Sequence, residues 1–164
     1  GIDSTFVYGR LDFAGLVPDM EFDLVVNLES WANGEARPRR VLRLDAKVQD
    51  RKLTEWKVEG REESSPSHWS NNDESAKAAL LRNFEFRLPL SWLLATPGSS
   101  LSSDHTHNGE NGAQSKSGAA PIPPTSRLKL RFSLWQNRLP VDALPVEGWI
   151  DLHLVSESEL ASGM

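Results

Sequence analysis

The chain has 164 residues, of which 38% are hydrophobic and 25% are charged, and this suits a single domain with one core. Its net charge of −5 argues against nucleic acid as a partner, because non-specific binding to nucleic acid needs a basic surface. There is no cysteine, which excludes disulfides and thiolate metal sites, and no apolar run reaches the roughly 20 residues that span a bilayer, so we expect no membrane partner.

Alternation of apolar and polar side chains along the chain is typical of half-buried β-strands. The pattern predicts strands over residues 5–13, 22–28, 41–48, 53–58, 84–90, 128–135 and 150–155. The polar residues 49–52 suit a hairpin turn, and Asn33-Gly34 indicates a second turn in the connection of residues 29–40, which also carries Trp31.

Helical structure is predicted only in short pieces. Residues 73–81 could form a short helix, and residues 91–95 could form one helical turn with Ser91 as its N-cap. The connection after the strand of residues 128–135 is rich in proline and apolar side chains. We expect it to pack Leu139, Val141, Leu144 and Val146 beneath itself.

Residues 96–126 differ from the rest of the chain, since they are dense in Gly, Ser, Asn and Pro and nearly free of apolar side chains. Such a composition cannot bury enough surface to offset the entropy of ordering, so we expect a disordered, low-complexity insertion. Within it, residues 104–110 (DHTHNGE) contain metal-ligand residue types. A metal site needs a rigid framework, and we therefore predict no metal site there.

These elements predict an all-β fold, an antiparallel β-sandwich of the jelly-roll or immunoglobulin-like type with one short helical segment. Residues 1–164 form a single domain in this interpretation. No glycine-rich nucleotide fingerprint, nucleophile elbow or zinc-protease motif is present, and no pair of carboxylates stands out. We therefore expect no catalytic residues in this segment and no cofactor.

Carbohydrate binding remains a candidate function, because β-sandwiches bind sugars with exposed aromatic rings beside planar polar groups. Trp31 and Trp69 lie in polar surroundings and are the first candidates for stacking rings. Outward strand positions offer further candidates, provided that their strands share one sheet: Trp135, Arg131, Arg43, Asp45 and Arg10. The alternative is an ordinary solvated face with no ligand.

Three stretches carry a resemblance to a known family: YGRLDF near the start, EFRLPLSWLLA, and LRFSLWQNRLPVDALPVEGWIDLHL. The last two resemble the end of the accessory sandwich domain at the C-terminus of some bacterial glycoside hydrolase family 57 proteins. The strand and turn RLPL…LL within the second stretch are also similar to the late strands of DOMON-like and family 9 carbohydrate-binding modules, and YGRLDF looks like the first strand of such a module. The resemblance covers roughly half of the chain.

The resemblance implies a non-catalytic module that binds carbohydrate, with an α-glucan as the first candidate ligand. It also implies an upstream catalytic domain in the same polypeptide as a partner. The alternative is a structural domain that packs on the catalytic domain and binds no sugar, in which case its exposed aromatic residues would be interface anchors.

Overall fold

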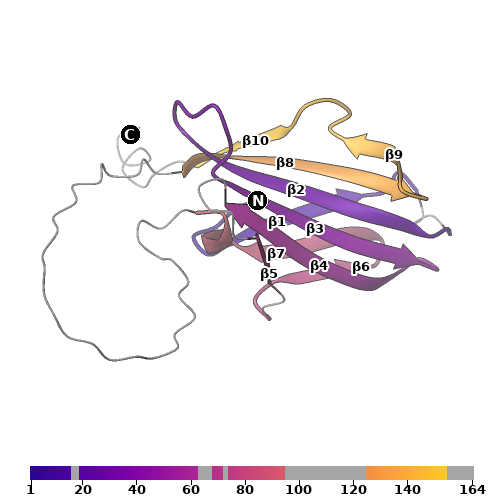
Figure 1. Ribbon diagram of the computed structural model, residues 1–164. Helices are drawn as coiled ribbons and strands as arrows, with labels where there is room; N and C mark the ends of the chain where they lie inside the picture. Colours follow the sequence, from indigo (N-terminus) through magenta and orange to yellow (C-terminus); the bar gives the residue numbers. More distant parts are fainter. Residues whose placement is uncertain (16–18, 63–67, 72–73, 95–124, 155–164) are drawn as a thin grey trace, which may run out of the picture.

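The computed structural model describes residues 1–15, 19–62, 68–71, 74–94 and 125–154, as shown in Figure 1. The side chains of residues 62, 68–71, 125 and 126 lie outside this description. The predicted insertion of residues 96–126 also lies almost wholly outside it, except that the strand that follows begins at Thr125.

Two antiparallel sheets form the sandwich that the sequence predicts, and they are stacked face to face in Figure 1. The three-stranded sheet has the order β1-β7-β6, and its members are β1 (Phe6–Asp12), β7 (Asn83–Pro89) and β6 (Lys77–Leu80). The seven-stranded sheet has the order β10-β8-β2-β3-β4-β5, with β9 also paired to β8. Its strands are β2 (Phe22–Ala32), β3 (Arg40–Gln49), β4 (Lys52–Glu62), β5 (His68–Asn71), β8 (Thr125–Gln136), β9 (Leu139–Leu144) and β10 (Ile150–His153).

The core lies between the two sheets and is built from every second residue of the long strands. On β2 the core-facing positions run from Phe22 through Leu24, Val26 and Leu28, all nearly or fully buried. Val7 on β1 and Leu88 on β7 close the core from the three-stranded sheet. The period of two that predicted these strands is therefore the alternation between the core and the opposite face.

The predicted hairpin between β3 and β4 is confirmed. Its turn consists of Asp50 and Arg51, both with positive φ angles of 51° and 61°. A similar turn at Asn137 and Arg138 joins β8 to β9, with φ angles of 51° and 66°. Two-residue turns of this handedness match the right-handed twist of the flanking strands.

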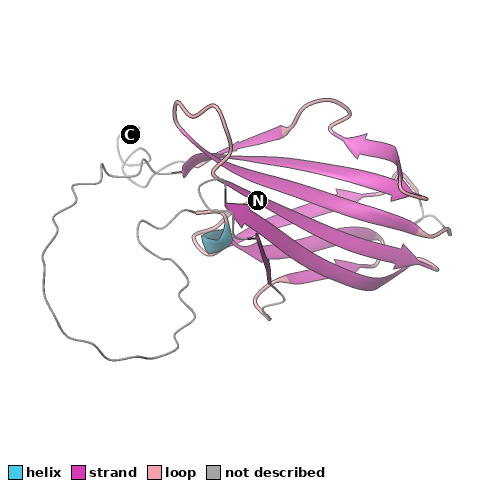
Figure 2. Ribbon diagram, viewed as in Figure 1, coloured by secondary structure: helices cyan, strands magenta, loops and turns pink. Residues whose placement is uncertain are grey.

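The helix predicted for residues 73–81 is wrong. Residues 77–80 form β6, which pairs with β7 and places Leu80 in the core. The alternation of exposed and buried residues in this short strand outweighs the helix propensity of its alanines. In the described residues, helical structure is limited to the 3₁₀ turn η1 (Leu90–Trp92), drawn in cyan in Figure 2, and Ser91 lies within this turn instead of capping it.

The packing predicted for the proline-rich connection is also wrong. Residues 139–144 form the edge strand β9, whose side chains are largely exposed. Leu139, Val141, Leu144 and Val146 expose 66%, 57%, 48% and 77% of their surface. The core cluster joins the three-stranded sheet to core-facing residues of β2, β3, β4 and β8, and these four side chains are not part of it.

Candidate functional site

The face of the seven-stranded sheet that points away from the three-stranded sheet, called the outer face below, collects most of the predicted site residues. Strand register places them in rows. Asn27 on β2, for example, lies between Arg131 on β8 and Arg43 on β3. Five of the seven predicted residues lie on this face: Trp31, Trp135, Arg131, Arg43 and Asp45.

Trp31 lies at one end of the outer face. The sequence places it in a turn, but β2 continues through it to Ala32, and its ring is half-buried. Its Nε1 donates a hydrogen bond to Glu29 Oε2 at 3.0 Å. The Lys129 ammonium lies 4.4 Å from the ring centroid and the Arg127 guanidinium carbon lies 5.6 Å from it, both distances at which a cation is attracted to an indole.

Trp135 lies at the other end of the same face. Its indole reaches back along β8, where Nε1 donates to Ser133 Oγ at 2.9 Å. Ser133 and Val25 are paired on the outer face but are only 9% and 2% exposed, so this part of the face is covered by neighbouring side chains. Trp135 is eight residues along β8 from the position opposite Trp31, which separates the backbone positions of the two tryptophans by roughly 25 Å.

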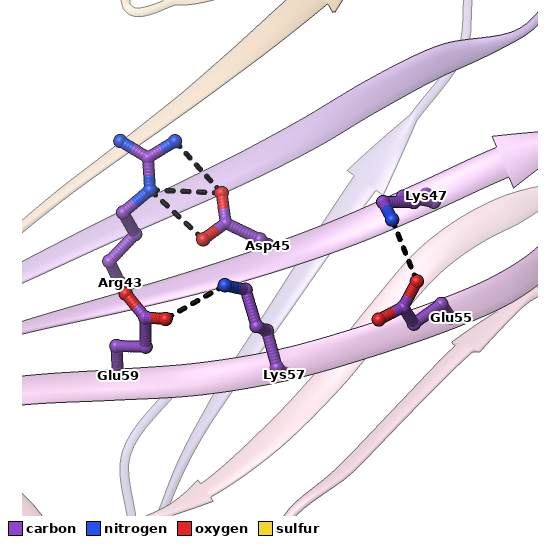
Figure 3. Close-up of polar contacts among 6 residues, drawn as sticks. All are labelled: Arg43, Asp45, Lys47, Glu55, Lys57 and Glu59. Atoms are coloured by element: carbon purple, nitrogen blue, oxygen red, sulfur yellow. Dashed lines mark hydrogen bonds and ion pairs between the residues drawn. The ribbon is translucent and has the colours of Figure 1, made fainter. Parts of the chain in front are cut away.

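Arg43 and Asp45 belong to a ladder of opposite charges on β3 and β4, shown in Figure 3. Arg43 Nε donates to both carboxylate oxygens of Asp45, at 2.9 and 3.0 Å. The Asp45 hydrogen bond raises the pKa of the Arg43 guanidinium above its ordinary value. The ladder continues with Lys57 bonded to Glu59 at 2.7 Å and with Lys47 bonded to Glu55 at 2.8 Å.

Charges in this ladder alternate both along and across the strands, because Arg43 is opposite Glu59, Asp45 is opposite Lys57, and Lys47 is opposite Glu55. Opposite charges in such cross-strand positions stabilise a sheet modestly. The hydrogen-bonding groups of Arg43 and Asp45 are therefore already engaged with each other. A ligand at these two residues would have to compete with their ion pair.

Arg131 supports the backbone of a neighbouring loop. Its guanidinium donates to the carbonyl oxygens of Val146 at 3.2 Å and Gly148 at 3.4 Å. It thereby ties residues 145–149, the loop between β9 and β10, to the outer face. Part of its hydrogen-bonding capacity remains, since a guanidinium carries five N–H donors.

Arg10 and Trp69 do not join this cluster. Arg10 lies on β1 in the three-stranded sheet, so it faces solvent on the opposite side of the sandwich, where it is paired with Asp12. The backbone of Trp69 is part of β5 and pairs with Gly60 at the far edge of the larger sheet. The side chain of Trp69 lies outside the described residues.

The residues that the prediction missed are Asn27 and Lys129, which lie between the two indoles. Neither side chain has a hydrogen-bond partner in the described part of the chain. Both could have been found from the sequence, because they occupy outward positions in strands whose period-two pattern was already clear. What the sequence lacked was the pairing of β2 with β8, which joins strands about a hundred residues apart.

No group of three or more histidine or acidic side chains suited to a metal ion occurs in the described ranges, and residues 104–110 lie outside them. Likewise, no helix within these ranges has the length and apolar character needed to cross a membrane. No protein-family model, curated protein or solved structure matches the chain.

Proposed function

We propose that the chain is a non-catalytic carbohydrate-binding module whose ligand lies along the outer face between Trp31 and Trp135. The observation that carries this proposal is the position of two half-buried indoles on one face, with backbone positions roughly 25 Å apart along β2 and β8. Aromatic rings stack on the apolar faces of sugar rings. At this separation the indoles would contact different units of one extended ligand and could not clamp a single ring.

The groups between the two indoles suit hydroxyl groups. The Asn27 amide both donates and accepts hydrogen bonds, and Lys129 and Arg131 donate. Asn27 makes no hydrogen bond with another described residue. The Lys129 ammonium lies over the Trp31 ring at 4.4 Å, and a sugar stacking on that side of the ring would displace it. The line from Trp31 to Trp135 therefore offers polar contacts along its middle and an aromatic surface at each end.

The balance of charge favours a neutral ligand. Among the described residues of the outer face, eight cations stand against six carboxylates: Arg43, Lys47, Lys52, Lys57, Arg61, Arg127, Lys129 and Arg131, against Asp23, Glu29, Asp45, Glu55, Glu59 and Asp151. A polyanion binds through a clear excess of positive charge. A neutral linear glycan, with malto-oligosaccharides as the first candidates, fits this surface better than an acidic polymer does.

The experiment is a titration of the whole chain with neutral oligosaccharides of increasing length, followed by tryptophan fluorescence and calorimetry. Affinity should rise with the number of sugar units until the ligand reaches from Trp31 to Trp135. Trp31→Ala and Trp135→Ala should each weaken binding about tenfold or more, as expected for buried aromatic anchors. Tyr8→Ala is the matched control, because Tyr8 is an exposed aromatic residue of the three-stranded sheet.

A second candidate function is a structural domain that packs on a catalytic domain of the same polypeptide and binds no sugar. The charge ladder of β3 and β4 favours it, because those side chains bond to one another as on an ordinary solvated face. Absence of any saturable response to maltose-, cellulose- and xylan-derived oligosaccharides would contradict the glycan proposal and leave this second candidate.

A further inference from the structure

Exposed apolar side chains are concentrated in one short segment at the edge of the seven-stranded sheet. The described chain has seven large hydrophobic side chains that are exposed, and four of them lie within residues 138–147: Leu139, Val141, Leu144 and Val146. The segment, called the 138–147 segment below, comprises β9 and the start of the following loop, along the sheet edge at the upper right of Figure 1. Such a cluster is typical of an interaction surface.

The order of residues in this segment is self-complementary. The sequence is RLPVDALPVE, and its centre is the bond between Asp142 and Ala143. When a second copy runs in the opposite direction, Leu139 of one copy is opposite Val146 of the other, and Val141 is opposite Leu144. Pro140 is then opposite Pro145. At the two ends, Arg138 of one copy meets Glu147 of the other, so opposite charges face each other there. The two Asp142 carboxylates lie near the axis and oppose the contact modestly.

The backbone of β9 is poorly suited to sheet extension, so contact between copies would be made by side chains. Pro140 has no N–H to donate. The Ala143 N–H donates instead to Asp142 Oδ1 at 2.8 Å, which occupies a donor of the strand. The pairing of β8 with β9 also shifts register between Leu134 and Trp135, an irregularity that twists an edge strand.

A shallow apolar depression lies beside this segment. It is lined by Leu11 of β1, Phe132 and Leu134 of β8, and Leu144 of β9. It marks the place where the three-stranded sheet ends and the inner side of β9 is left uncovered. An aliphatic side chain from a second copy could fill it.

We propose that the 138–147 segment is a homodimer interface in which two copies pack antiparallel about a two-fold axis at the Asp142–Ala143 bond. In such an isologous contact the same surface of both copies is used. Four aliphatic side chains per copy bury less than the roughly 800 Å² per partner of a standard stable interface. The dimer is therefore weak and depends on concentration. It does not depend on the proposed glycan site.

Sedimentation equilibrium of the whole chain, from about 1 µM to about 1 mM, covers the range of weak association. The average mass should rise from that of one chain toward that of two. Val141→Lys should hold the mass at one chain throughout the range. Leu81→Lys is the matched control, because Leu81 is 83% exposed in the β6–β7 turn, outside the 138–147 segment, and it should dimerise as the parent chain does. Circular dichroism confirms that both variants fold.

Exchanging the charges of residues 138 and 147 tests whether the partner is a second copy of the chain. Arg138→Glu and Glu147→Arg should each weaken the dimer, because each places like charges opposite one another. The double variant Arg138→Glu/Glu147→Arg restores opposite charges at both ends and should recover the parent association. A monomer at every concentration would overturn the proposal, and so would a double variant that associates no better than either single variant.

Discussion

The ring of Phe86 on β7 lies directly over Gly9, its cross-strand partner on β1. A Cβ atom at residue 9 would overlap three atoms of that ring, so the core side of β1 has room for no side chain there. Phe86 also contacts Phe132 of β8, with ring centroids 6.1 Å apart. Because Gly9 has no side chain, it leaves the space that the Phe86 ring occupies while it contacts Phe132 of the other sheet.

Gly9→Ala should therefore destabilise the fold by about 1–3 kcal/mol, the usual cost of overpacking a core. Chemical denaturation measures the change. Gly15→Ala is the control, because no atom lies within 4 Å of a Cβ at that position, and its effect should stay within about 0.5 kcal/mol. Equal stability of the Gly9 and Gly15 variants would show that the ring can move aside.

A glycine in the β3–β4 turn should stabilise the fold more than an alanine at the same position. Arg51 has a φ angle of 61°, in the left-handed region that costs a residue with a side chain about 1 kcal/mol or more. We expect Arg51→Gly to be more stable than Arg51→Ala by up to about 1 kcal/mol in thermal and chemical unfolding. Both variants lose the exposed contact of Arg51 with Asp19 at 3.4 Å, so the comparison isolates the backbone. A glycine variant no more stable than the alanine variant would contradict this.

A pH dependence should arise from Glu35 in the connection between β2 and β3. Arg39 donates to its carboxylate from Nε at 2.9 Å and from Nη2 at 2.7 Å, and these hydrogen bonds lower the pKa of Glu35 below its ordinary value of 4.5. Because the folded pKa is the lower one, the pair stabilises the fold above about pH 4.5 and loses this effect as pH falls through the folded pKa.

An NMR titration of the Glu35 carboxyl carbon measures that pKa directly. In Arg39→Gln the pKa should return toward 4.5, since its main cause is removed. A Glu35 pKa that is the same with and without the Arg39 guanidinium would show that the hydrogen bonds do not persist in solution.

The sheets could be predicted from the sequence because long half-buried strands carry a strong local signal. Val41 to Val48 alternates without a break, and the structure places Leu42, Leu44 and Ala46 in the core as that pattern indicates. Short strands lack such a signal. β6 has four residues, too few to separate a period of two from a helical pattern, and its alanines favour a helix.

The outer face could be predicted only in part. Alternation indicates that Trp135 and Arg131 point away from the core, but it does not reveal which strands are neighbours. For that reason the sequence pattern groups Arg10 with Arg43, although they lie on opposite sides of the sandwich. The Asn33-Gly34 pair indicates a turn around Trp31, whereas the pairing of β2 with β8 extends the strand past Trp31.

The seven-stranded sheet has its longest strands in the middle and short strands at its borders. In the described chain, β2, β3, β4 and β8 have 10 to 12 residues, whereas β9, β10 and β5 have six, four and four. A long, open strand is a template on which other chains can add and build a fibril. Here β2, β3 and β8 are flanked by other strands on both sides along much of their length. On its side away from β3, β4 is paired with β5 only over residues 58–61. The open edge is therefore short for three of the four long strands, which limits aggregation.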